Sequence, residues 1–170
     1  MRVRSALVLA SASVGLVAVG AGPASAAKSA CTNGVIGELA AAKDPENVPV
    51  ALENGGAIVK TCRDLNDDGR KDALFTVESG GTGGAFFGGI VSDSGYGPEL
   101  RAWVVGHQKT SFGFRKGRPA FAWPVYKKNE PSCCATGGWK VRRFVPDGPG
   151  FKALATQHLK SRRYPLRSRP

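Results

Sequence analysis

From residue 57 onward, hydrophobic and polar residues alternate in short runs, which is the period of β-strands. Gly, Pro, Asn and Asp interrupt these runs at intervals of about a dozen residues, a spacing typical of antiparallel sheets. The pattern predicts a mainly β domain, a small antiparallel sheet with strands over residues 57–62, 73–78, 85–92, 100–105, 110–114, 120–126, 139–145 and 151–155.

Turn residues between the runs predict hairpins and therefore a meander. Lys116-Gly117 and Asp147-Gly148 each separate two strand-like runs, and Gly supplies the backbone conformation that tight turns need. The GGTGG segment over 80–84 is interpreted as a hairpin turn, because neither a Lys-Ser/Thr pair nor a helix follows it, as a phosphate loop requires. Pro124 has no amide hydrogen, so we expect its run to be an edge strand or to carry a bulge.

Before the strands, apolar residues recur at helical spacing. Residues 33–43 present one apolar face, with Asn33 as the expected cap and Asp44-Pro45 as the end. The sequence therefore predicts one short N-terminal helix in front of the sheet.

The first 26 residues have the pattern of a signal peptide. A basic start is followed by an apolar run over 6–19 and by Ala24-Ser25-Ala26, the small residues that a signal peptidase requires. The alternative is a membrane anchor, but the run is shorter than the roughly 20 residues that cross a bilayer. We expect a secreted or envelope protein with a single domain over 27–157 and no transmembrane anchor after cleavage. The end, 158–170, is rich in basic residues, contains no acid and is expected to be disordered.

Charge divides the chain into two unlike halves. The whole sequence has 24 Lys and Arg against 13 Asp and Glu, a net charge of +11. Residues 27–100 contain 6 basic and 11 acidic residues, a net −5, whereas residues 101–170 contain 16 and 2, a net +14. The second half is therefore the one that can present a basic surface to an anionic partner.

Basic and aromatic residues interleave in that half, and two interpretations stay open. The pattern is typical of a polyanion-binding sheet, and also of amphipathic strands whose aromatic residues face the core; we favour the second. For an exported protein the polyanion would be an anionic cell-wall polymer or a lipid headgroup, and nucleic acid is not expected. The candidate anion-binding residues are Arg115, Lys116, Arg118, Lys127, Lys128, Lys140, Arg142 and Arg143.

The four cysteines are Cys31, Cys62, Cys133 and Cys134, and export favours disulfides over metal ligands or nucleophiles. A bond between the neighbours Cys133 and Cys134 would need a strained eight-membered ring, so we expect each of them to pair with Cys31 or Cys62. The alternative, a vicinal redox or metal-sensing pair, lacks CxxC spacing and a nearby His.

The segment DLNDDGRKD, residues 64–72, carries the most specific chemistry. Calcium takes six to eight oxygen ligands on a flexible loop, and a Gly at the sixth position lets the next carbonyl turn inward. The twelfth position is Phe75, where an EF-hand has a bidentate Glu. The loop predicts a structural calcium site; the alternative is a polar turn whose carboxylates are solvated or paired with nearby bases. The candidate ligands are the side chains of Asp64, Asn66, Asp68 and Asp72 and the carbonyl group of Arg70.

Two resemblances rest on these motifs. DLNDDGRKDALFTV is similar to the calcium loop and following strand of FG-GAP and VCBS-type repeats, in a single copy. The order DLNDDGRKDAL, GGTGGAFFGGIVSDSG and NEPSCCATGGWKVRRFV resembles the LppP/LprE-type family of small bacterial envelope proteins over residues 62–151. The resemblance implies an envelope or secreted location and a β fold, without a biochemical activity. This chain lacks the lipidation Cys of the lipoprotein members.

Catalytic motifs are absent from the sequence. Neither a GxSxG elbow nor an HExxH helix occurs, and acidic residues are rare around the two histidines, His107 and His158. We therefore expect a non-enzymatic protein of unknown ligand. A small secreted hydrolase and a secreted inhibitor are the alternatives.

Overall fold

A computed structural model describes residues 29–93, 95–161 and 163–170, and the predicted signal peptide lies outside this part. Helices form only before the first strand, and the rest of the described chain is strands and connections. The helices are α1 (Asn33–Ala41) and α2 (Val48–Glu53), and the strands are β1 (Ile58–Arg63), β2 (Asp72–Glu78), β3 (Ala85–Asp93), β4 (Pro98–Val105), β5 (Ser111–Arg115), β6 (Arg118–Pro124), β7 (Trp139–Asp147), β8 (Gly150–Ala153) and β9 (Gln157–Leu159).

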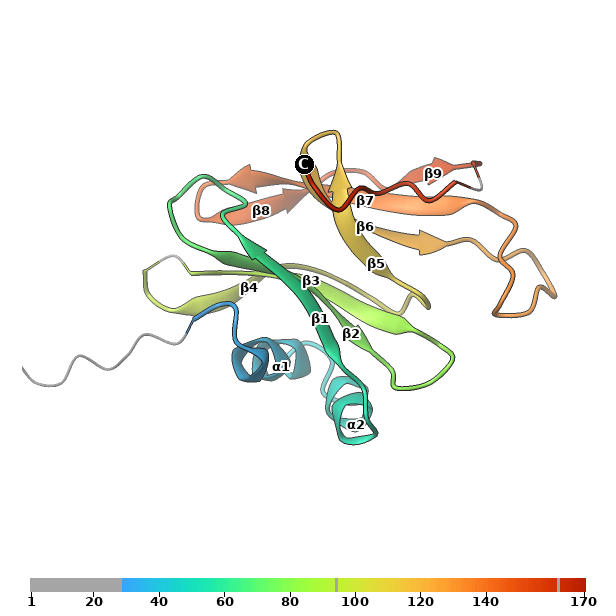
Figure 1. Ribbon diagram of the computed structural model, residues 1–170, viewed down its shortest axis with the longest axis horizontal. Coiled ribbons are helices and arrows are strands. Elements are labelled where there is room, and N and C mark those ends of the chain that lie inside the picture. Colours follow the sequence, from blue (N-terminus) through green and yellow to red (C-terminus); the bar gives the residue numbers. More distant parts are fainter. Residues whose placement is uncertain (1–28, 94, 162) are drawn as a thin grey trace, which may run out of the picture.

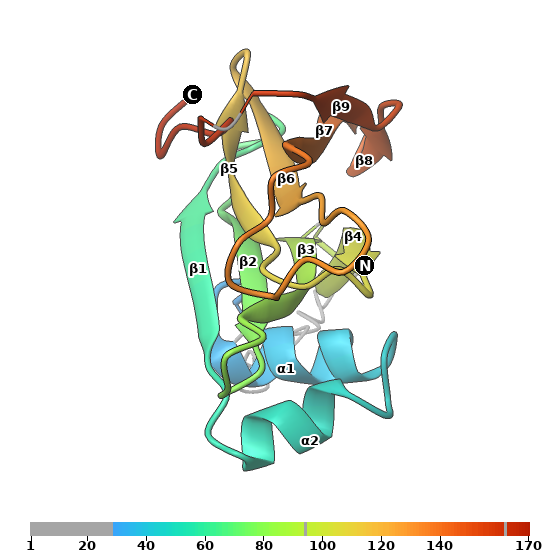
Figure 2. The same cartoon turned by 90° about the vertical axis from the view of Figure 1, so that its right-hand side faces the viewer.

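The strands form two antiparallel sheets that pack face to face. The first sheet has the order β1-β2-β3-β4, and the second has the order β5-β6-β7-β8 with β9 paired to β7. The two helices cover the face of the first sheet that points away from the second, so three layers stack (Figure 1; Figure 2). The prediction of a mainly β, antiparallel domain with a meander is confirmed.

The central layer has a core on each side. Alternate residues of β2 point to opposite faces, so Phe75 and Val77 pack under the helices while Leu74 packs against the second sheet. On β3, Gly88 faces the ring of Phe121, and a Cβ atom at residue 88 would stand 2.6 Å from Phe121 Cε1. The missing side chain therefore lets the two sheets approach each other closely.

A second helix, α2, was not anticipated by the sequence pattern. It has only six residues, too few to display a helical repeat, and Pro49 lies in its first turn, where a missing amide hydrogen costs nothing. Val48 and Ala51 are buried against the first sheet. Packing rather than periodicity therefore stabilises this helix.

The predicted hairpins form. Arg115 pairs with Arg118, and the residues between them, Lys116 and Gly117, have φ values of 53° and 70°. Both central residues of this turn are thus in the left-handed region, as a type I′ turn requires. The GGTGG segment joins β2 to β3, as predicted. The last hairpin turns one residue later than expected, because Asp147 still pairs with Gly150.

The expectation for Pro124 was wrong. Its strand, β6, lies between β5 and β7 and is therefore central rather than an edge. Pro124 is the last residue of β6 and pairs with Trp139. The ladder ends at the proline, so no amide hydrogen is missing from the interior of the sheet.

Described residues of the 158–170 segment, for which disorder is expected from the sequence, pack on the second sheet. Leu159 is the last residue of β9, and Leu166 is 7% exposed among Ala120 and Val141 on the outer face of the second sheet. The backbones of Phe114 and Arg167 exchange hydrogen bonds of 2.8 and 2.9 Å. Apolar residues spaced among the basic ones thus cover a face that would otherwise be exposed, and the segment lies across the sheet as a strap (Figure 1).

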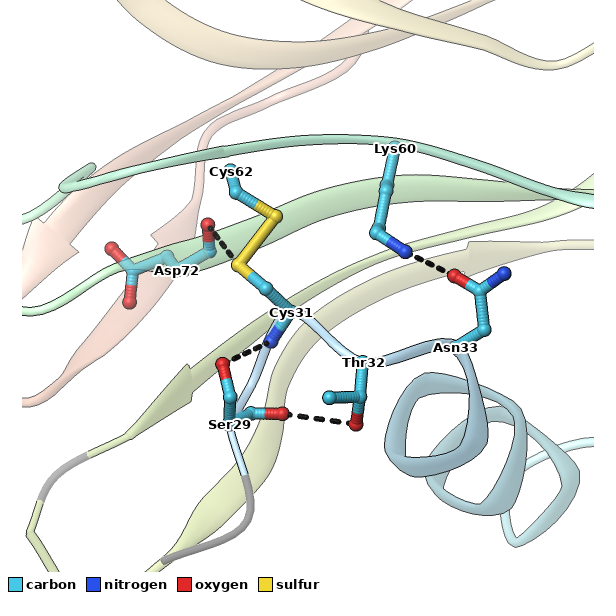
Figure 3. Close-up of a disulfide and its surroundings, with 7 residues drawn as sticks. All are labelled: Ser29, Cys31, Thr32, Asn33, Lys60, Cys62 and Asp72. Atoms are coloured by element: carbon cyan, nitrogen blue, oxygen red, sulfur yellow. Dashed lines mark hydrogen bonds between the residues drawn. A yellow bond between two sulfur atoms is a disulfide. The ribbon is translucent and has the colours of Figure 1, made fainter.

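The expected disulfide pairing was also wrong. Cys31 is bonded to Cys62, with Cα atoms 6.1 Å apart, and Cys133 is bonded to its neighbour Cys134. The first bond ties the segment before α1 to β1 (Figure 3). The second lies in the connection between β6 and β7. Cys31 and Cys62 belong to the helical layer and the first sheet, whereas Cys133 and Cys134 belong to a connection of the second sheet.

No helix in the described part of the chain is both long enough and apolar enough to span a membrane.

Candidate functional site

The candidate calcium loop connects β1 to β2. Arg63 and Asp72 are the last register pair of these strands, so residues 64–71 protrude from the end of the first sheet. Gly69 at the sixth position has φ +82°, the sharp turn for which a glycine was expected there, and Asp67 also lies in the left-handed region at 62°.

The acidic side chains at the front of the loop organise its backbone. Asp64 accepts hydrogen bonds from the amide groups of Asp68 (3.2 Å) and Gly69 (2.8 Å), and Asp68 accepts the amide of Arg70 (2.8 Å). The Asn66 side-chain amide donates to Asp68 Oδ2 at 3.1 Å. Desolvation opposes ionisation of Asp64, but these backbone amides together outweigh it and lower its pKa.

Asp72, at the ninth position, has a different environment from the other acids. Its side chain is fully buried; Oδ2 accepts the Leu65 amide at 2.8 Å, whereas Oδ1 has no hydrogen-bond partner among the described residues. Burial raises the pKa of the Asp72 carboxyl, and the nearby Ser92 hydroxyl and the Leu65 amide only partly oppose this rise. Ser92 Oγ likewise is buried with no hydrogen-bond partner of good geometry among the described residues. The base of the loop therefore holds a carboxylate oxygen that lacks compensation.

The donor set suits a hard cation, although its members are not gathered around one point. Carboxylate, amide and carbonyl oxygens are the ligands that calcium prefers. Among the described residues, no three His, Cys, Asp or Glu side chains converge as a ready metal site. Asp64 and Asp68 instead face amides of their own loop. Binding would exchange some of these contacts for the ion, and Asp72 Oδ1 has no contact to lose.

The candidate anion-binding residues do not form one surface. Arg115, Lys116 and Arg118 lie at the β5–β6 turn, which we call the hairpin cluster. On β7, Arg142 shares the inner face with Phe144 of the core between the sheets, whereas Arg143 points to the outer face. The favoured interpretation, with aromatic residues facing inward, holds for Phe114, Phe121 and Trp123, which are at most 5% exposed.

Lys127 and Lys128 belong to the β6–β7 connection, which also carries the Cys133–Cys134 disulfide. Glu130 holds this connection together by accepting hydrogen bonds from the Thr136 hydroxyl and from the amides of Lys127 and Thr136. The hydrogen bond from the Thr136 hydroxyl has the largest effect, and together these bonds lower the pKa of Glu130 to about 2. Both cysteines of the connection are exposed to solvent.

A hollow of about 500 Å³ was not predicted from the sequence. It lies between α2 and the ends of β3 and β4, where Val50, Phe86 and Val105 contribute to its walls. These residues come from separate segments, so no local sequence signal could have found it.

The two histidines have other contacts than catalytic ones. His107 stacks on Trp123, and a ring nitrogen of His158 lies 2.7 Å from the Gly137 carbonyl oxygen. Neither of these contacts is the Ser–His or Cys–His pair that nucleophilic catalysis requires.

Comparison of the chain with family models, with curated proteins and with solved structures finds no match.

Proposed function

We propose that this protein is an exported, non-enzymatic envelope or extracellular binding protein whose 64–72 loop binds Ca²⁺ as a structural ion. The observation that carries the proposal is the buried Asp72 carboxylate at the base of an oxygen-rich loop, whose Oδ1 atom has no partner in the described part of the chain. A buried charge without compensation costs several kcal/mol, and a cation supplies that compensation.

A calcium ion at this position would act on the fold rather than on a substrate. The loop joins two neighbouring strands of the first sheet, and Arg63 and Asp72 close it. An ion that binds only the folded loop stabilises the folded state by mass action, by about 2.7 kcal/mol when free Ca²⁺ is 100 times its dissociation constant.

Export is supported by two independent features. Residues 1–26 have the three-part pattern of a signal peptide. Cys31 and Cys62 form a disulfide, which persists in oxidising compartments outside the cytoplasm.

Binding to an anionic wall polymer or lipid headgroup is the second part of the proposal. Residues 101–170 carry a net charge of +14, and their basic side chains are spread over the β5–β6 turn, the β6–β7 connection and both faces of β7. Retention of the mature protein on anionic wall polymer should fall steeply between low and high salt, because mobile ions screen exposed charges. Absent or salt-independent retention would contradict this part.

The calcium part is tested by thermal unfolding of the mature protein after metal removal. We expect Ca²⁺ to raise Tm, and Asp72→Asn to abolish that increase without lowering Tm in the absence of metal, because it removes an uncompensated buried charge. Asp67→Asn is the matched control, since Asp67 is exposed in the same loop and lies outside the predicted ligand set. A wild-type Tm that does not respond to Ca²⁺ would refute the calcium site.

A further inference from the structure

The space between the two sheets opens to solvent at the beginning of β7. Lys140 and Arg142 lie on the inner face of this strand, in register with Trp123 and Phe121 of β6. Phe121 is fully buried, Arg142 is half-buried and Lys140 is exposed. The inner face of β7 therefore changes from core to solvent within a few residues. We call this opening between the sheets the mouth, and the cationic side chains of Lys140 and Arg142 lie at it.

An imidazole lies at the same mouth. His107, in the connection from β4 to β5, stacks on Trp123 with ring centroids 4.1 Å apart and planes 4° from parallel. Trp123 is 5% exposed, so the imidazole covers the indole and is held in one plane by it. Burial lowers the pKa of His107, and the positive charges of Arg142 and Lys140 lower it further.

Within the described chain, Lys140 and Arg142 lack an acidic partner. Residues 101–170 contain only two acids, Glu130 and Asp147. Glu130 accepts hydrogen bonds within its own connection, and Asp147 is at the opposite end of β7 from Lys140. In the part of the chain that the structure describes, no carboxylate pairs with Lys140 or Arg142.

The other polar side chains near the mouth already have hydrogen-bond partners within the protein. Arg142 Nε donates to Thr156 Oγ1 at 2.9 Å, which orients the guanidinium and leaves its terminal amino groups for another acceptor. Lys109, two residues after His107, donates to the Ser132 carbonyl at 2.6 Å. His158 is in register with Lys140, but its ring nitrogen is engaged by the Gly137 carbonyl.

We propose that His107, Lys140 and Arg142 form a binding site for a phosphate-type oxyanion. The inference rests on the anionic-polymer part of the proposed function and is independent of the calcium loop. Arg142 offers a planar fork that matches two oxygens of one anion, and Lys140 and protonated His107 offer further donors. A phosphate group has more acceptor oxygens than a carboxylate, so it satisfies three donor groups better than a carboxylate does.

The His107 ring provides a direct measurement of occupancy. A bound anion favours the protonated imidazole, so phosphate should raise the pKa of His107, observed by NMR titration of its ring protons at constant ionic strength. We expect an increase of about one unit, which corresponds to tenfold tighter binding by the protonated form. Chloride and acetate are the reference anions. An unchanged His107 titration in phosphate would overturn the proposal.

Two double variants separate a defined site from diffuse attraction. Lys140→Gln with Arg142→Gln removes two charges at the mouth, and Lys152→Gln with Arg169→Gln removes two exposed charges that lie outside the candidate anion-binding residues. We expect the first pair to weaken phosphate binding at least tenfold and the second to change it less than twofold. Equal losses would contradict the site. If the first double variant fails to fold, Lys140→Gln alone and the wild-type His107 titration still test whether the site exists.

The source of the phosphate group is distinguished by the probe. Inorganic phosphate, a soluble glycerol-phosphate oligomer and vesicles containing phosphatidylglycerol are compared with wild type and the Lys140/Arg142 variant. Selective loss of oligomer binding in the variant assigns the site to a polymer, and selective loss of vesicle binding assigns it to a headgroup. Retention of all three by the variant refutes the site. One outcome would refute this site but leave the proposed polymer binding intact. In that outcome the Lys140/Arg142 variant still binds the polymer, and phosphate does not change the pKa of His107.

Discussion

The Sγ atom of Cys31 lies 3.7 Å from the main-chain carbonyl oxygen of Asp72 (Figure 3). Cys31 precedes α1, and its disulfide partner Cys62 pairs in register with Ala73, the residue after Asp72. The disulfide thus packs against the residue that closes the candidate calcium loop. Nearby, the Lys60 ammonium donates to the Asn33 side-chain oxygen, a second link between β1 and the start of α1.

The two disulfides should contribute very differently to stability. Cys31–Cys62 closes a separation of 31 residues, which corresponds to about 3–4 kcal/mol in the chain-entropy model. Cys133–Cys134 joins neighbours and restricts the unfolded chain little. We expect Cys31→Ser with Cys62→Ser to lower the free energy of unfolding in urea by that amount. Cys133→Ser with Cys134→Ser should change it by less than about 1 kcal/mol. Similar losses in the two variants would contradict this assignment.

Close approach of the sheets at Gly88 should make that position intolerant of a side chain. Because a Cβ atom there would stand 2.6 Å from the Phe121 ring, Gly88→Ala must displace a buried aromatic side chain. We expect a loss of about 1–3 kcal/mol in the free energy of unfolding. Gly81→Ala is the control, since no described residue beyond its chain neighbours lies within 4 Å of the place that a Cβ atom would take there. A stability of Gly88→Ala equal to that of the control would show that the sheets are farther apart.

The strap formed by the C-terminal segment should protect β5. Leu166 is buried on the outer face, and the Phe114 amide donates to the Arg167 carbonyl at 2.8 Å. Leu166→Ala should cost about 2 kcal/mol and accelerate hydrogen exchange at the Phe114 amide. Arg169→Ala, at an exposed position of the same segment, should do neither. Unaltered exchange at Phe114 in Leu166→Ala would indicate that the strap does not stay docked.

Glu130 should make the β6–β7 connection sensitive to acid. Hydrogen bonds from the Thr136 hydroxyl and two backbone amides lower the pKa of Glu130 to about 2, below its ordinary value of 4.5. A carboxyl whose pKa is lowered by folding stabilises the folded state fully above its unfolded pKa. That contribution is lost as the pH falls from 4.5 toward 2. We expect Glu130→Gln to flatten part of the decline in Tm over this range.

The control for Glu130 is Asp147→Asn, an exposed acid at the end of β7. It should leave the acid dependence of Tm close to that of wild type. An identical pH profile for Glu130→Gln and wild type would mean that the connection is held by other contacts.

Local features of the chain were predictable because they depend on near neighbours. Short β-rich runs bounded by turn residues located β2, β3 and β7. The Lys116-Gly117 turn followed from the backbone conformation that glycine permits, and the 64–72 loop followed from oxygen-bearing residues at regular spacing between two strands.

Features that depend on which segments meet were decided only by the tertiary structure. The sequence could not show that Cys31 meets Cys62, that the tail of basic residues buries Leu166, or that Asp72 alone among the loop acids is enclosed. His107 stacks on Trp123 because two sheets converge at that connection, and neither residue carries a local signal for the other. Periodicity is set by covalent neighbours, whereas burial and pairing are set by the packing of layers, and both candidate sites depend on that packing.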